Sequence, residues 1–209
     1  MFLPVFSIFT ILISHTYYSS ANSVFDFCVA DFSHSGPGGY GCKDPTTVTV
    51  DNFVYSGLAI PNNNTTKVDN IIVDTNKLPG LNGMGVTMAR AYFPVGTGDP
   101  VHTHRVSEAV VVNQGTLLIG FIDSNNTAYY KTLNAGEMMI IPHTFMHFII
   151  NVGSTPAIAY GAFGSEIPGK QSINNAFYGG NLPSDLVEKI TLLDSPQVHN
   201  FKKRFGGTN

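Results

Sequence analysis

Charged residues are scarce in this chain of 209 residues, and this scarcity excludes whole classes of partner and fold. Only 12% of the residues are Asp, Glu, Lys or Arg, and the formal net charge is −3. Without a basic field there is nothing to hold a phosphate backbone, which sets nucleic-acid binding aside. A mainly helical protein would carry more charge, whereas 21 Gly and 12 Pro suit an all-β fold with many turns.

Long apolar runs are absent beyond the N-terminus, so no membrane span is expected. Residues 2–13 are apolar but form too short a run to cross a bilayer as a helix. Polar and then small residues follow, as in a secretory signal that is cleaved after Ala21 or Ser23. We therefore expect residues 1–21 to be a signal peptide and residues 22–209 to form one domain. The alternative for the apolar run is a buried strand.

Cysteine is nearly absent, since Cys28 and Cys42 are the only two. In a secreted protein this pair is expected to form a disulfide that closes a Gly-rich loop without regular structure. The alternative is two free buried thiols. In a secreted protein, three N-glycosylation sequons are expected acceptor sites, and they begin at Asn63, Asn64 and Asn125.

Between residues 46 and 165, short apolar segments alternate with turn signals at regular spacing. This rhythm predicts an antiparallel sandwich or barrel with no convincing helix. The predicted strands are 46–50, 53–60, 71–73, 85–93, 108–112, 116–122, 128–133, 137–141, 145–152 and 157–163. After Pro183 the pattern changes to two short amphipathic helices within 183–206, the second capped by Ser195 and ended by Gly206.

The chemistry is concentrated around a His-x-His pair. Residues two apart on a strand point to the same face, so His102 and His104 present adjacent imidazoles. On a straight strand Glu108 would lie roughly 20 Å from His102, at about 3.3 Å per residue. The chain must therefore turn at 105–107 if Glu108 is to face back from the next strand. His147, at the start of a later predicted strand, supplies a fourth donor.

Three imidazoles and one carboxylate make a mixed nitrogen and oxygen site without thiolate. Such a set suits Mn²⁺ or Fe²⁺ with open positions for water, substrate or oxygen. Zn²⁺ is an alternative that spacing does not exclude. A lone His-x-His is common and mostly has no function, but a nearby Glu and an opposing His raise the pattern well above that background. His143 follows Pro142 in a turn and is not expected to be a ligand.

Residues 96–115 match the first cupin motif, Gly-x5-His-x-His-x3-Glu-x6-Gly. Residues 136–151 resemble the second motif, Gly-x5-Pro-x-Gly-x2-His-x3-Asn, except that Thr144 replaces the second Gly. The whole chain resembles plant germin-like proteins, and its tail is most similar to the auxin-binding-protein-like branch. Thr144 leaves the shape of its turn open, because a β-branched residue tolerates positive φ poorly. His147 is still expected to be a ligand.

The resemblance implies a jelly-roll β-barrel that holds manganese, with short C-terminal α-helices that clasp neighbouring subunits. It further implies a hexamer, as a trimer of dimers, in the apoplast or cell wall. Some relatives oxidise oxalate with two asparagines near the metal. Asn82 matches one of them, and Asn151 is a further candidate for substrate binding. Asp99 occupies the other position, where a carboxylate would repel dianionic oxalate.

Two functions follow from this resemblance. The first is superoxide dismutation by the metal centre, with oxalate oxidation less favoured because of Asp99. The second is a non-enzymatic extracellular binding or storage protein that holds a small carboxylate ligand. Nucleotide-sugar hydrolysis, a third function of such relatives, has no support here, because the sequence has no glycine loop that would cradle phosphate.

Overall fold

Two antiparallel sheets of five strands each form the body of the molecule. The computed structural model describes residues 26–36, 39–59 and 66–208. The predicted signal peptide and the sequons at Asn63 and Asn64 lie outside this part. The strands of the two sheets are β3 (Asp69–Val73), β4 (Thr87–Phe93), β5 (Gly98–Thr103), β6 (Glu108–Gln114), β7 (Thr116–Ile122), β8 (Ala128–Asn134), β9 (Met138–Ile141), β10 (Met146–Asn151), β11 (Ala157–Phe163) and β12 (Gln171–Ser172).

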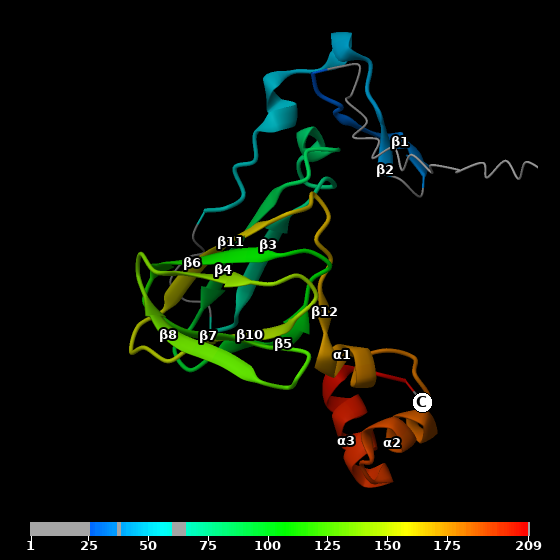
Figure 1. Ribbon diagram of the computed structural model, residues 1–209. Coiled ribbons are helices and arrows are strands. Elements are labelled where there is room, and N and C mark those ends of the chain that lie inside the picture. The colour runs from blue at the N-terminus through cyan, green and yellow to red at the C-terminus, as the bar shows by residue number, and fades with distance from the viewer. Residues whose placement is uncertain (1–25, 37–38, 60–65, 209) are drawn as a thin grey trace, which may run out of the picture.

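One sheet has the strand order β12-β5-β10-β7-β8 and the other has the order β3-β4-β11-β6-β9. Neighbours in each sheet are mostly distant in the sequence, so the chain passes back and forth between the two layers. Figure 1 shows the layers facing each other as a jelly-roll barrel. The all-β prediction is thus confirmed, and most predicted strands lie within a few residues of the observed ones.

The core lies between the sheets because alternate residues of each strand face inward. Along β10, for example, His147, Ile149 and Asn151 are buried while their neighbours are more exposed. The apolar cluster contains Phe93, Val110, Val112, Leu117, Ile119, Leu133, Ile141, Ile149, Ala157 and Ala159. The same alternation that builds this core also aims polar side chains into the barrel.

The N-terminal region differs from the sequence-based expectation. The Gly-rich loop is a hairpin of β1 (Ala30–Gly36) and β2 (Gly39–Cys42), closed by the predicted Cys28–Cys42 disulfide. The strands predicted at 46–50 and 53–60 are wrong for the residues that the structure describes, 46–50 and 53–59, which form no strand. Short 3₁₀ helices η1 (Pro45–Thr47) and η2 (Val50–Phe53) occupy much of this stretch, and a third, η3 (Pro79–Leu81), precedes β4.

Three helices close the other end of the chain: α1 (Ile173–Tyr178), α2 (Ser184–Thr191) and α3 (Ser195–Phe205). The predicted helices correspond to α2 and α3, whereas α1 was not expected. The cap of α3 is Asp194, whose carboxylate accepts from the backbone N–H of Gln197, so Ser195 is already inside the helix. In Figure 1 these helices lie at the opposite end of the molecule from the β1–β2 hairpin.

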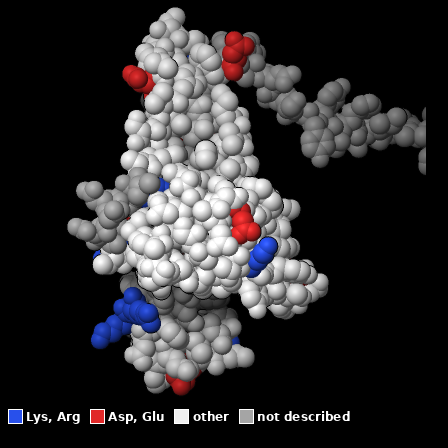
Figure 2. Space-filling view, turned by 90° about the vertical axis from the view of Figure 1, so that its left-hand side faces the viewer, with Lys and Arg blue, Asp and Glu red and all other residues white. Residues whose placement is uncertain are grey.

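The surface is consistent with the low charge content of the sequence. Figure 2 shows one face on which charged side chains are few and most of the area is uncharged. Across the described ranges, no helix has both the length and the apolarity that crossing a membrane requires. Asn125 is exposed in the β7–β8 turn, which leaves this sequon sterically open to a glycan.

Candidate metal centre

Strand geometry places His102 on the inner face of β5, His104 directly follows the last residue of that strand, and both side chains are buried. The chain then turns, and Glu108 opens β6 in the opposite sheet, as the spacing predicted. His147 lies on β10, directly across from His102 in the β5–β10 register. Residues from both sheets therefore face one interior region.

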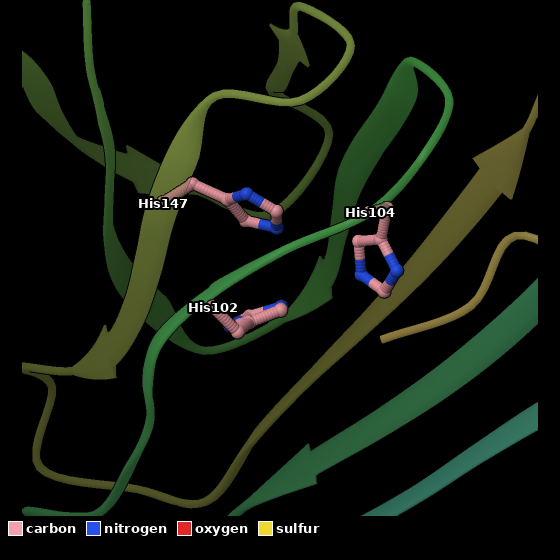
Figure 3. A group of neighbouring side chains, drawn as sticks. All are labelled: His102, His104 and His147. Carbon is pink, nitrogen blue, oxygen red and sulfur yellow. The ribbon is translucent and has the colours of Figure 1, made fainter. Parts of the chain in front are cut away.

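The donor atoms of this group are close enough to share one cation. Those of the three histidines all lie within 4.8 Å of one another. Glu108 Oε2 is 3.2 Å from His147 Nε2 and 3.8 Å from His104 Nε2. Figure 3 shows the three imidazole rings converging on a common space between the strands. The structure thus brings together all four of the residues that the sequence predicted as ligands.

Each imidazole is oriented by a backbone carbonyl. His102 Nδ1 donates to Pro100 O at 2.7 Å, His147 Nδ1 donates to Phe145 O at 2.9 Å, and His104 Nδ1 donates to Gly169 O. A carbonyl oxygen only accepts hydrogen bonds, so in each ring the proton is on Nδ1. The lone pair of each Nε2 is left for a cation, as in histidines that bind metals.

Electrostatics also favour a cation here. Burial lowers the pKa of His102 to about 3, and burial likewise lowers the pKa of His104, so these rings are neutral at physiological pH. His147 Nε2 and Glu108 Oε2 are buried without a hydrogen-bond partner. Buried polar atoms in this state are costly unless something satisfies them. A divalent cation between the four side chains would satisfy both, so the residues fit a metal ion.

Thr144 has a backbone φ of +66°, the positive angle for which the cupin motif has a glycine at this position. Two hydrogen bonds tie its backbone to the end of β5: Thr144 N donates to His104 O at 3.1 Å, and Thr103 Oγ1 donates to Thr144 O at 2.7 Å. The turn keeps the left-handed conformation despite its β-branched side chain. His147 consequently still points into the site.

Comparison with known proteins decides the family. The family described as Cupin matches residues 56–199. Auxin-binding protein ABP19a of Prunus persica is 42% identical, with all of both chains covered. The chain is a germin-like member of the cupin family. A germin-like protein of Morus alba is 40% identical, also with all of both chains covered.

The fold of this germin-like cupin is shared with solved oxalate oxidases. An oxalate oxidase in complex with the substrate analogue glycolate has a TM-score of 0.82 at 30% sequence identity. The match covers 88% of this chain and 96% of that chain. A second oxalate oxidase structure matches with a TM-score of 0.81 at 31% identity, and with the same coverage.

The two asparagines singled out for substrate binding are both buried and have hydrogen-bond partners within the protein, and their part in substrate binding stays a prediction. Asn82 Nδ2 donates to Tyr40 O at 3.1 Å, which ties the η3 region to the N-terminal hairpin. Asn151 Nδ2 donates to the carbonyls of Phe93 and Thr155, and its Oδ1 accepts from Gly153 N, each at 2.9 Å. Both amides therefore hold backbone segments in place.

A cavity of about 470 Å³ leads to the donors of the germin-like cupin, and its wall contains a residue that the sequence analysis missed. Asp99 lines this cavity, as expected of a residue near the metal. Lys170, on the segment that leads into β12, places its ammonium 2.5 Å from one Asp99 oxygen and 2.7 Å from the other. The two residues are 71 positions apart, so no local pattern could have revealed the pair.

Proposed function

We propose that this germin-like cupin is a secreted manganese protein of the apoplast or cell wall that dismutes superoxide. The observation that carries the proposal is the buried set of three imidazoles and one carboxylate, with His147 Nε2 and Glu108 Oε2 unpartnered. In the overall reaction, two superoxide anions and two protons give one dioxygen and one hydrogen peroxide. A manganese ion, when bound, supplies the one-electron redox chemistry.

The protein side chains determine the environment of this chemistry. His102, His104 and His147 offer nitrogen donors, and Glu108 offers an oxygen donor without any thiolate, a set that suits Mn²⁺ or Fe²⁺ and does not exclude Zn²⁺. The backbone carbonyls that hold each Nδ1 fix the direction of each ring before any ion arrives. The cavity then gives a small anion access from solvent.

A second candidate is a binding protein without turnover. The cavity is wide enough for a small carboxylate, and an oxalate oxidase of the same fold holds glycolate. Relatives from Prunus persica carry the name auxin-binding protein, which describes binding rather than a reaction. In this alternative the ion pairs with the ligand's carboxylate and the side chains exclude water from it.

Secretion and assembly complete the proposal. The Cys28–Cys42 disulfide supports an oxidising compartment, because such bonds persist mainly in extracellular proteins. Assembly as a hexamer, a trimer of dimers, is supported by the apolar residues that the C-terminal helices expose. Leu186 and Ile190 of α2 and Phe201 of α3 are more than a third exposed in the isolated chain.

The deciding experiment compares metal content and dismutation in three proteins secreted by a plant or insect cell. These are the wild-type chain, His102→Ala and, as the matched control, His143→Ala. His143 is an exposed histidine on the turn before β10 and is not part of the donor group. We expect His102→Ala to lose at least tenfold in both manganese affinity and dismutation, and His143→Ala to retain both.

The outcomes separate the alternatives. Manganese at one ion per chain with dismutation that His102→Ala abolishes supports the enzyme. Full manganese without turnover, together with saturable glycolate binding, supports the binding protein. A wild-type chain that binds no divalent ion after dialysis against Mn²⁺, Fe²⁺ and Zn²⁺ would contradict both.

A further inference from the structure

The charged residues around the cavity are arranged in opposite pairs. Lys170 pairs with Asp99 at 2.5 Å, Arg90 pairs with Asp69 at 2.7 Å, and Lys77 lies 3.8 Å from Asp74. Asn70 adds a hydrogen bond to Asp99 Oδ2 at 2.8 Å. Each cation on the described cavity wall thus faces an acid, so the pairs contribute little net charge.

Glu108 is different, because it faces imidazoles rather than a lysine or arginine. With a divalent cation bound, the two positive charges of the ion and the single negative charge of Glu108 leave the centre with one net positive charge. The residues of the cavity wall add no net charge to the centre as long as their ion pairs are intact. A centre with one positive charge is matched by a ligand with one negative charge.

Of the three pairs, Asp99–Lys170 is the one in which each residue lies next to a predicted metal ligand. Asp99 precedes His102 by three residues on β5, and its Oδ1 is 3.8 Å from His102 Nδ1. Lys170 directly follows Gly169, whose carbonyl accepts the hydrogen bond from His104. The pair therefore links β5 to the segment that leads into β12, and both of its residues line the cavity. Neither side chain is fully buried, and both border the space that an anion entering the cavity would occupy.

The charges of the pair affect the pKa values of the neighbouring histidines. Burial is the main cause of the low pKa of His102, and against that background Asp99 raises this pKa while Lys170 lowers it. Lys170 also lowers the pKa of His104. Because Asp99 and Lys170 pair directly beside His102, removing either charge would leave the other uncompensated there.

We propose that the Asp99–Lys170 pair is a specificity device that sets the charge of the accepted anion, favouring small monoanions over dianions. The inference rests on the proposed metal centre. Losing Asp99 leaves Lys170 unpaired, and the site gains one positive charge that favours a dianion. Losing Lys170 leaves Asp99 unpaired, and the site repels anions, dianions most. The oxalate repulsion expected from Asp99 alone is thereby revised, because Lys170 compensates that carboxylate.

The test uses two small carboxylates of different charge, glycolate as the monoanion and oxalate as the dianion. Binding of each to the manganese-loaded, full-length protein is measured by calorimetry and by the manganese electron paramagnetic resonance signal. The proteins are wild type, Asp99→Asn, Lys170→Met and the double variant. Lys189→Met is the control, because Lys189 forms an exposed pair with Asp185 on α2, outside the cavity. Metal content is measured before and after each titration.

In Asp99→Asn, the ratio of oxalate affinity to glycolate affinity rises at least fivefold over wild type, since one unit charge acts across a short, partly desolvated distance. In Lys170→Met this ratio falls at least fivefold. The double variant returns to within twofold of wild type, because its wall is neutral again, and Lys189→Met does not change the ratio.

Smaller changes in both single variants at full manganese content overturn the inference while leaving the metal centre standing. A wild-type chain without manganese instead overturns the proposed function. If Asp99→Asn fails to load manganese, Lys170→Met, which retains Asp99, still decides the matter by its own threshold.

Discussion

At the residue scale, Gly161 determines how closely β11 approaches Glu108. A Cβ at this position would lie 2.6 Å from Glu108 Oε1, well inside contact distance. Gly161 is in the extended strand β11, so alanine strains no backbone angle there and the barrel is expected to fold. The cost falls instead on the carboxylate, which must turn away from His147. We therefore expect Gly161→Ala to weaken manganese binding by about 10-fold to 100-fold, the usual loss when a neighbour of a metal ligand is changed.

Competition with a metal-sensitive dye measures this affinity in the secreted protein. Gly164→Ala is the matched control, because a Cβ at Gly164 meets no atom within 4 Å. Equal manganese affinity in the two variants would show that the space at Gly161 is not needed by Glu108.

At the element scale, the turn between β9 and β10 stores strain in Thr144. A β-branched residue at φ +66° costs about 1–2 kcal/mol relative to its preferred conformations. Glycine removes this strain but makes the unfolded chain more flexible, which offsets part of the gain. We expect Thr144→Gly to raise the free energy of unfolding by about 0.5–1 kcal/mol, a net value left after these two effects.

Urea unfolding at fixed metal and protein concentration measures the change. Asn126→Gly is the control, since Asn126 has nearly the same angle, φ 64°, but asparagine tolerates it. This substitution is expected to shift stability by only a few tenths of a kcal/mol and keeps the sequon at Asn125. A Thr144→Gly chain less stable than wild type would mean that the threonine side chain stabilises the turn.

Elements with a clear period were predictable from the sequence, and so was the site that they carry. His102 and His104 share a face by parity, Glu108 requires a turn to reach them, and His147 heads a strand with its alternate residues buried. These are local rules, and the structure places the side chains as the rules predict, while their role as metal ligands stays a prediction. The antiparallel barrel followed from the same period, repeated along the chain.

The alternation of apolar residues predicted strands wrongly where side-chain hydrogen bonds to the backbone favour a turn instead. The carboxylate of Asp44 accepts from Thr46 N at 2.9 Å, and Asn52 Oδ1 accepts from Thr49 N at 3.0 Å. Such side-chain bonds to the backbone stabilise 3₁₀ turns over the strands that alternation suggested. Lys170 could not be found at all, because its meeting with Asp99 depends on the tertiary fold. The hydrogen bond from Asn82 to Tyr40 O likewise joins residues far apart in the sequence, so no local pattern predicts it.

At the scale of the whole molecule, the proposed metal centre lies in the barrel, apart from the two ends of the chain. The β1–β2 hairpin lies at one end and helices α1 to α3 at the other (Figure 1). The Cys28–Cys42 bond closes the hairpin, whose strands pair from Ala30 and Cys42 onward. None of the described hairpin residues lines the cavity that contains His102, His104 and Glu108. Loosening the hairpin should therefore leave the donors in position.

The Cys28→Ser/Cys42→Ser double variant tests this separation. Cross-linking a loop of this size stabilises a fold by about 3 kcal/mol in the chain-entropy account, so the hairpin is expected to open readily without the bond. Hydrogen exchange should rise at least tenfold across 28–42, while manganese affinity stays within threefold of wild type. Wild-type protein treated with dithiothreitol must reproduce the effect, and the variant must be insensitive to it. Loss of manganese in both would instead mean that the hairpin supports the barrel, through the bond from Asn82 to Tyr40 O, strongly enough to position the ligands.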